Sequence, residues 1–171
     1  MSIIFYSILG FLGFVLLFGT FFIVRQQSAA IVERFGKFVS VRQSGLQIKI
    51  PIIDRVAGRV SLRVQQLDVV VETKTKDDVF VKIKVSVQYK VINDKVFDAF
   101  YKLDFPQDQI TSYVFDVVRA EVPKMILDDV FEKKDDVAIA VKSELNDSML
   151  NYGFDIIKTL VTDIDPDAQV K

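Results

Sequence analysis

The sequence predicts an α+β domain that follows one N-terminal membrane-spanning helix. Residues 1–24 contain no charged residue, and all 22 Lys and Arg and all 23 Asp and Glu lie at or after Arg25. Strand-like alternation then fills the first half of the remaining chain, and helix-like spacing of apolar residues fills most of the second half. We therefore expect an anchor at residues 1–24, a domain at residues 28–165 made of an antiparallel sheet with packed helices, and the start of a truncated C-terminal helix at residues 166–171.

The N-terminal segment is long and apolar enough to cross a bilayer. Sixteen of its 24 residues are Leu, Ile, Val or Phe, and as a helix it would be about 36 Å long, against a hydrocarbon core of about 30 Å. The residues expected to anchor the chain are Ile3, Phe5, Leu9, Phe11, Phe14, Leu17, Phe18, Phe21 and Val24.

Two other interpretations of this segment are weaker. A cleaved signal peptide would need a basic region before the apolar run and a shorter run, although Ser28, Ala29 and Ala30 supply small residues for cleavage. A hairpin within one leaflet would be helped by a central proline, and the first proline is Pro51. Basic residues follow the segment and none precedes it, which by the positive-inside rule places the domain on the cytoplasmic side.

Short strands are expected first in the domain. Residues 30–34 and 38–41 read as a hairpin, and residues 45–51 alternate as a further strand. The clearest alternation covers residues 79–91, and it predicts a strand with one buried and one wet face. Before it the alternation slips by one residue at Gln65 and Gln66, which predicts a β-bulge, and Lys76, Asp77 and Asp78 predict a hairpin turn.

Helical periodicity then takes over. Asn93 is an expected cap for a short helix, Pro106 suits the first turn of a second, and a third is expected from residue 134 to 151 with Gly153 as its left-handed cap. Residues 154–161 read as a returning strand. Asp165 followed by Pro166 predicts the start of the last helix.

Composition and motifs argue against catalysis. The chain has no Cys and no His, which removes thiolate nucleophiles, thiolate metal ligands and the usual proton-transfer side chain. It has no glycine-rich phosphate loop, no G-x-S-x-G motif, and a net charge of −1 without a basic stripe interleaved with aromatics. We therefore expect no enzyme, no cofactor, no metal, no small-molecule substrate and no nucleic-acid partner.

The acidic clusters are better interpreted as caps and turns than as sites. Asp163, Asp165 and Asp167 resemble the start of a calcium loop, but Ala168 stands where glycine is expected. The remaining pairs sit at expected turns or helix starts, where carboxylates cap free N–H groups: Asp77–Asp78, Asp128–Asp129 and Asp135–Asp136. The aromatic residues at helical spacing are expected to be core rather than a ligand pocket.

Several segments resemble the stomatin/prohibitin/flotillin (band 7) family, and most of all its hypersensitive-induced-reaction subgroup. The resemblance covers residues 29–171, and its most specific segments are residues 60–68, 72–77, 98–103, 113–119 and 127–132. It implies an α+β domain held against a membrane, with copies joined side by side into large rings or cages that organise membrane patches. It departs from plant members of the subgroup, which begin with an acylation signal, since this chain has Ser2 and no Cys.

The first functional hypothesis is therefore a non-enzymatic membrane scaffold that forms a large homo-oligomer and regulates a membrane protease or channel, as relatives do. The alternative is a lipid- or ligand-binding module. In that interpretation anionic head groups contact the basic face of the strand at residues 79–91, together with the residue that follows the anchor: Lys82, Lys84, Lys90 and Arg25.

Overall fold

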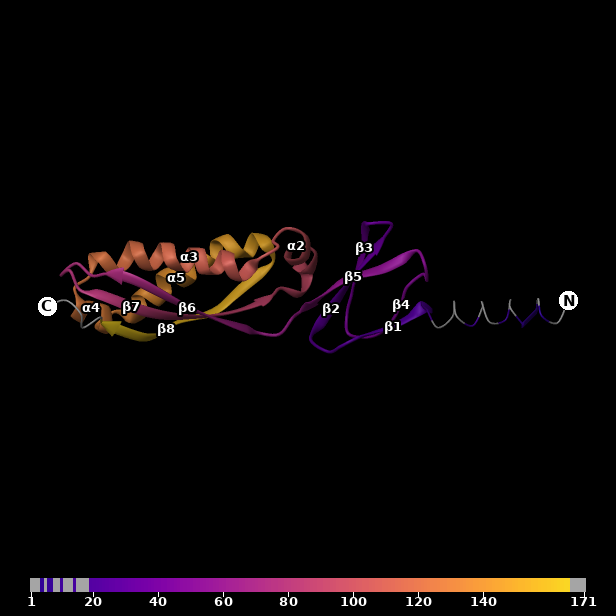
Figure 1. The fold of residues 1–171 in the computed structure, drawn as a ribbon, viewed down its shortest axis with the longest axis horizontal. Helices are drawn as coiled ribbons and strands as arrows, with labels where there is room; N and C mark the ends of the chain where they lie inside the picture. Colours follow the sequence, from indigo (N-terminus) through magenta and orange to yellow (C-terminus); the bar gives the residue numbers. More distant parts are fainter. Residues whose placement is uncertain (1–3, 5, 8–9, 11–13, 15–18, 167–171) are drawn as a thin grey trace. The chain divides into compact units, whose positions relative to one another are not determined.

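The computed structural model describes residues 4, 6–7, 10, 14 and 19–166. The chain divides into two compact units, unit 1 (Met1–Arg63) and unit 2 (Val64–Lys171), and each is described by itself (Figure 1).

Residues 21–61 of unit 1 form five short strands in two antiparallel sheets. Strand β1 (Phe21–Val24) pairs with β4 (Gly45–Ile48), and β2 (Ser28–Arg34) lies between β3 (Lys37–Arg42) and β5 (Asp54–Ser61). The core of this unit is the middle of β2, where four consecutive apolar residues are buried. The expected hairpin is confirmed as β2 and β3, with Phe35 and Gly36 at its turn.

The prediction that the apolar helix continues to Val24 is wrong at its C-terminal end. Phe21–Val24 form a strand because β-branched and aromatic residues suit extended backbone and β4 offers four register partners. Val24 is 2% exposed in the core, so it does not face lipid. Strand β1 thus begins at Phe21, before Ser28, where the first residue of the domain was expected.

The other anchor predictions are largely untested. Phe14 is described and exposed, whereas six predicted anchor residues lie outside the described part of the chain: Ile3, Phe5, Leu9, Phe11, Leu17 and Phe18. In the described part of the chain, no helix combines the length and the apolar character that crossing a membrane requires.

Unit 2 is built on a three-stranded antiparallel sheet in the order β6-β7-β8, made of β6 (Gln65–Lys74), β7 (Phe80–Val91) and β8 (Phe154–Pro166). The predicted alternation of β7 is confirmed, because its odd-numbered residues from Val81 to Val91 are buried. The predicted bulge at Gln65 and Gln66 is wrong. The slip in alternation instead marks the passage from β5, which ends at Ser61, to β6, which begins at Gln65 in another sheet.

Helices α3 (Pro106–Glu121) and α5 (Lys134–Met149) pack along one face of this sheet, as Figure 1 shows. The shorter elements are α2 (Val96–Tyr101), α4 (Leu127–Glu132) and the 3-10 turns η1 (Asn93–Lys95), η2 (Val122–Lys124) and η3 (Leu150–Tyr152). Pro106 begins α3 and Gly153 adopts φ 84° after η3, as predicted. Asn93 lies inside η1 and is not the expected side-chain cap.

The prediction of a helix starting at Asp165 and Pro166 is wrong for these two residues. They belong to β8, where Asp165 pairs with Lys82 and Pro166 with Val81. The long β7 offers partners as far as its first residues, and a proline without an N–H group is tolerated where a strand ends at a sheet edge. The rest of the expected helix, residues 167–171, lies outside the described residues.

Candidate membrane-contact surface

One face of the β1–β4 ribbon is entirely apolar and open to solvent. The register places Phe21 opposite Ile48 and Ile23 opposite Leu46, and all four side chains are exposed. Neighbouring apolar side chains on one face of a two-stranded ribbon are normally covered by another layer. Contiguous exposed apolar patches mark contacts with proteins or membranes.

The ribbon leads to a turn and a hairpin that expose further apolar residues. Ile52, in the turn between β4 and β5, is 91% exposed, and Phe35, between β2 and β3, is 83% exposed. Arg34 pairs with Lys37 of β3 and with Asp54 of β5, so both turns lie at the same end of the three-stranded sheet.

Both residues also have left-handed backbone conformations, with φ of 49° for Phe35 and 71° for Ile52. This region suits Gly or Asn, and a β-branched residue there is an outlier that costs about 1–2 kcal/mol. Strain of this kind, at side chains exposed to water, indicates a function other than stability.

The chain enters β1 beside the same turn. The Lys49 amide donates a hydrogen bond to the Thr20 carbonyl at 2.8 Å, and a Cβ atom at Gly19 would lie 3.4 Å from Cβ of Pro51. We call the exposed apolar residues of this ribbon and these turns the apolar surface of unit 1: Phe21, Ile23, Phe35, Leu46, Ile48, Ile50, Ile52 and Ile53.

A buried carboxylate holds the β4–β5 turn in place. Asp54 accepts hydrogen bonds from Nε and Nη2 of Arg34 at 2.8 and 3.3 Å and from the Ile50 amide at 2.9 Å. The Arg34 hydrogen bonds, with the Ile50 N–H second, hold the pKa of Asp54 below its usual value. The turn that carries Ile52 is therefore fastened to the end of β2.

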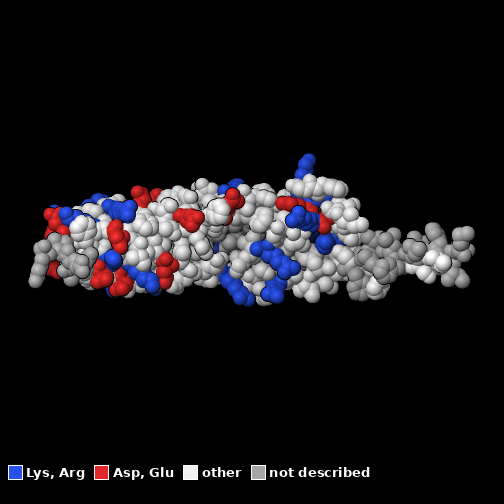
Figure 2. Space-filling view, in the orientation of Figure 1, with Lys and Arg blue, Asp and Glu red and all other residues white. Residues whose placement is uncertain are grey.

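The charges of the chain are divided between the units. Residues 1–63 carry eight of the 22 Lys and Arg but only two of the 23 Asp and Glu, so unit 1 has a formal charge of +6 and the remainder of the chain −7. Figure 2 shows mainly Lys and Arg over the β2–β5 region and both signs mixed over the β6–β8 sheet. A basic unit with an exposed apolar surface has the chemistry of a protein that contacts anionic lipid.

The four predicted head-group residues do not share one environment. Arg25 follows β1 in unit 1, whereas Lys82, Lys84 and Lys90 lie on the open face of β7 in unit 2. Each lysine has a carboxylate partner on a neighbouring strand: Lys82 with Glu72 at 3.2 Å, Lys84 with Asp68 at 3.1 Å and Lys90 with Asp155 at 3.9 Å. The face of β7 is therefore a ladder of ion pairs and not a free basic surface.

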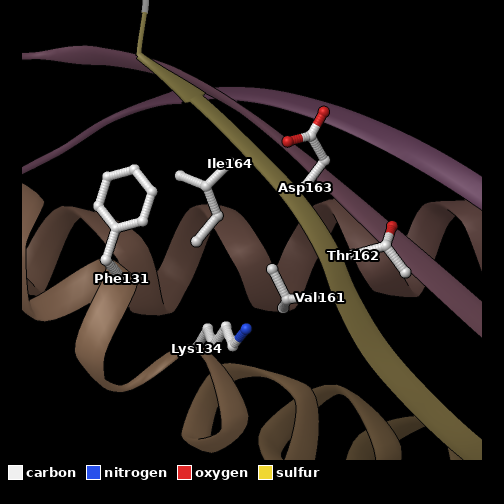
Figure 3. Close-up of a pocket in the computed structure, with 6 residues that line it drawn as sticks. All are labelled: Phe131, Lys134, Val161, Thr162, Asp163 and Ile164. Atoms are coloured by element: carbon white, nitrogen blue, oxygen red, sulfur yellow. The ribbon is translucent and has the colours of Figure 1, made fainter.

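Open hollows are also present among the described residues of unit 2. One, of about 210 Å³, lies between α4, the start of α5 and β8. In Figure 3, Phe131, Val161 and Ile164 lie on the same side of β8, whereas Asp163 projects to the other side. The second, of about 270 Å³, adjoins the start of α3 and is lined by residues that include Tyr89, Phe105 and Phe154. Of the aromatic residues expected in the core, Phe154 is buried, whereas three are exposed: Tyr101, Phe105 and Phe131.

The acidic clusters have structural roles. Asp77 accepts a hydrogen bond from the Leu127 amide at 3.1 Å and so supports the start of α4, as its predicted capping role requires. Asp163 and Asp165 lie opposite Lys84 and Lys82 in the sheet. Among the described residues no group of three or more His, Cys, Asp or Glu side chains is placed to hold a metal ion.

Comparison with known proteins defines the family. The model of the SPFH domain / Band 7 family matches residues 22–171, a range that begins within β1. This chain belongs to the SPFH domain / Band 7 family. The SPFH domain is 46% identical over 149 residues to hypersensitive-induced response protein 4 of Arabidopsis thaliana, covering 86% of this chain and 51% of that protein.

Two further relatives define how far the similarity extends. The SPFH chain is 30% identical over 149 residues to the mitochondrial stomatin-like protein 2 of Homo sapiens, covering 86% of this chain and 41% of that protein. It is 28% identical over 168 residues to an uncharacterized protein of Methanocaldococcus jannaschii, covering 98% of this chain and 83% of that protein. The SPFH chain spans about half the length of the first two relatives or less.

Sequence reasoning missed the apolar surface of this SPFH domain, although two signals were present. The alternation at residues 45–51 predicted the strand, but nothing was inferred about which of its faces is covered. The net charge of −1 concealed the division of charge, since it averages a basic and an acidic unit. Counting charges separately on each side of the break near residue 63 would have found the basic unit.

Proposed function

We propose that this SPFH chain is the membrane-attached part of a non-enzymatic scaffold. Unit 1 contacts the bilayer through its apolar surface, and we call this contact the membrane seat. The observation that carries this proposal is the pair of strained, exposed turns, Phe35 and Ile52, at the end of the sheet where the chain enters β1. The uncharged apolar segment before β1 serves as the anchor, as its sequence favours.

The energetics of this seat combine apolar burial with charge. Removing an exposed Ile or Phe side chain from water contributes about 1.5–3 kcal/mol when burial is complete. Each Lys or Arg close to an anionic leaflet adds about 1 kcal/mol. The excess of basic residues after the apolar segment places unit 1 on the cytoplasmic side by the positive-inside rule.

Copies of the chain assemble laterally on the membrane into a large ring or cage. Side-by-side contacts between identical chains close into rings when the rotation between neighbours permits. Such an assembly organises the surrounding lipid and restrains a membrane protease or channel. Support for this part of the proposal comes from family membership.

Site-directed labelling of the full chain in nanodiscs tests the membrane seat. Because the natural chain has no cysteine, the single substitution I52C can carry a polarity-sensitive dye. We expect a blue-shifted emission, since Ile52 lies in the acyl region. The matched control is F80C, because Phe80 is exposed on β7 of unit 2 and its dye is expected to report water. Equal, water-like spectra at both positions would reject the seat.

Light scattering of the detergent-extracted or nanodisc-held chain tests assembly separately. We expect a large and discrete mass for the full chain. A monomer at high protein concentration would reject lateral assembly by this chain and would leave the membrane seat untouched. The lipid- and ligand-binding alternative through Lys82, Lys84 and Lys90 is less favoured, because each lysine is already paired with a carboxylate.

A further inference from the structure

Two buried polar atoms of unit 1 lack a hydrogen-bond partner within the described part of the chain. They are Oγ of Ser40 and Nε of Arg42, both on β3. Buried donors are nearly always bonded, and an exception requires an explanation such as a missing ligand. Both groups can donate a hydrogen bond, so the missing partner is an acceptor.

The sheet register places a third donor beside them. Residues two apart on a strand share a face, so Ser40 and Arg42 project to the same side of β3. Ala30 of β2 pairs with Arg42 on one side and with Arg59 of β5 on the other. Ala30 is fully buried between these two arginines, so their side chains flank one point on the sheet.

Nearby carboxylates do not satisfy these donors. Within residues 1–63 the only acidic residues are Glu33 and Asp54. The charge of Arg42 helps to lower the pKa of Asp54, but the hydrogen bonds that Asp54 accepts come from Arg34 and from the Ile50 amide. Side chains alternate between the two faces of β2, so residues three apart lie on opposite faces. Glu33 therefore lies on the opposite face from Ala30. The guanidinium of Arg59 is exposed and makes one long contact, of 3.4 Å, with the Ile23 carbonyl.

We propose that Ser40, Arg42 and Arg59 form a binding site for a phosphomonoester group. Ser40, Arg42 and Arg59 lie on one face of the sheet and supply two guanidinium groups and a hydroxyl, which are enough donors for the three terminal oxygens of a phosphomonoester. Arginine presents its donors as a planar fork that suits phosphate geometry, and it is the usual residue for such recognition.

The position of the site favours a lipid head group as the source of the phosphate. Ala30 lies five residues from Phe35, which corresponds to about 16 Å along an extended strand. Apolar side chains of surface-bound proteins enter the boundary between head groups and acyl chains by about 5–10 Å. With Phe35 at that depth, the site stands at head-group level. This inference rests on the proposed membrane seat and adds the class of lipid that the seat recognises.

The test observes the arginine side chains of the full chain by NMR in detergent micelles. Short-chain phosphatidic acid, short-chain phosphatidylglycerol and inorganic phosphate are titrated separately, and the Nε–H signals of Arg42 and Arg59 are followed, with Arg59 as the reporter in R42K. We expect a saturable shift with phosphatidic acid that is at least tenfold tighter than with phosphatidylglycerol. S40A and R42K should each weaken binding several-fold, since R42K keeps the charge and removes the fork.

The matched control is R55K, because Arg55 pairs with Glu33 and therefore lies on the opposite face of the sheet. It should leave the phosphatidic acid titration unchanged. A saturable shift with inorganic phosphate as well assigns the site to any phosphomonoester, whereas a response to phosphatidic acid alone assigns it to the lipid. No saturable shift, or equal effects of R42K and R55K, overturns the proposal.

Failure of this site can be separated from failure of the membrane seat. The dye at I52C is measured again in chains that also carry R42K. In the chain with natural Ser40, Arg42 and Arg59, a blue shift at I52C without a saturable NMR shift by phosphatidic acid rejects the phosphomonoester site and retains the seat. A water-like dye in the chain with natural Ser40, Arg42 and Arg59 rejects the seat itself.

Discussion

Ile52 is a residue at which stability and membrane contact are expected to oppose each other. Its β-branched side chain occupies a left-handed conformation and is almost fully exposed. Replacing Ile52 with Gly removes the strain at no packing cost, so we expect the free energy of unfolding to rise by about 1 kcal/mol. The same change removes an apolar group from the membrane seat and should weaken association with the bilayer.

Chemical denaturation of the detergent-solubilised chain measures the first effect, and a dye on F35C measures the depth of the neighbouring turn. Ile53→Gly is the control, because Ile53 is exposed but lacks a positive φ. It should lower stability, because the chain gains entropy in the unfolded state and the partly buried side chain is lost. If both variants lose stability equally, strain at Ile52 is not stored in the fold.

Gly153 is required both for its conformation and for space. Its φ is 84°, and a Cβ atom there would lie 2.6 Å from the carbonyl oxygen of Lys95. We expect Gly153→Ala to lower the free energy of unfolding by about 2–4 kcal/mol, from the left-handed conformation together with the clash. Gly36→Ala separates the two causes, because Gly36 has φ 79° with nothing within 4 Å. It should cost about 1–2 kcal/mol, and equal costs would mean that the neighbouring backbone yields.

Asp68 gives the chain a specific response to acid. Hydrogen bonds from Ser86, Gln66 and Lys84 lower the pKa of Asp68 to about 2. Because the pKa is lower in the folded than in the unfolded state, this carboxylate stabilises the fold above about pH 4, and the contribution is lost as pH falls towards about 2. Asp68→Asn should therefore have a lower melting temperature than the natural chain at pH 7. Its melting temperature should also change less with pH between pH 4 and about 2 than that of the natural chain. An unchanged slope would show that Asp68 has no such role.

The elements that sequence could predict are those with strong local patterns. The alternation of β7 and the apolar spacing of α3 and α5 follow from the burial of one face, and Pro106 and Gly153 mark boundaries by their backbone chemistry. The failures lie where pairing is non-local. Residues 21–24 are strand because β4 binds them, and Asp165 and Pro166 are strand because β7 extends to meet them. The local sequence pattern of a segment does not reveal which distant strand it will pair with.

The same reason explains what was missed at the site. The lysines of β7 looked free in sequence because their carboxylate partners come from β6 and β8. Ser40, Arg42 and Arg59 became neighbours only through the two registers of Ala30. Arg25 was the one predicted head-group residue that lies in the basic unit.

The β6–β7 turn and helix α4 are expected to be coupled through one side chain. Asp77 accepts hydrogen bonds from the Thr75 hydroxyl at 2.6 Å and from the Leu127 amide at 3.1 Å. Asp77→Ala should speed hydrogen exchange at the start of α4 several-fold, because the free N–H loses its acceptor. Asp78→Asn is the control, since Asp78 has φ 67° and Asn tolerates that conformation. Unchanged exchange at α4 in Asp77→Ala would show that the turn and the helix are independent.

At the scale of the whole chain, the opposite charges of the two units predict opposite responses to salt. Unit 1 carries +6 and attracts an anionic leaflet, whereas unit 2 carries −7, so neighbouring copies repel through it. Screening lengths fall from about 10 Å at 0.1 M to about 3 Å at 1 M salt. Raising salt should therefore reduce the blue shift of a dye at I52C in anionic nanodiscs and raise the mass of the assembled chain in neutral detergent.

Neutral-lipid nanodiscs supply the control for the first response, because without anionic lipid the dye at I52C should be nearly insensitive to salt. The second response discriminates between two ways of joining copies. A mass that grows with salt means that apolar contacts hold the copies together against the repulsion of their acidic units. A mass that falls with salt would contradict this view, because it would require ion pairs between copies that join the basic unit of one chain to the acidic unit of the next.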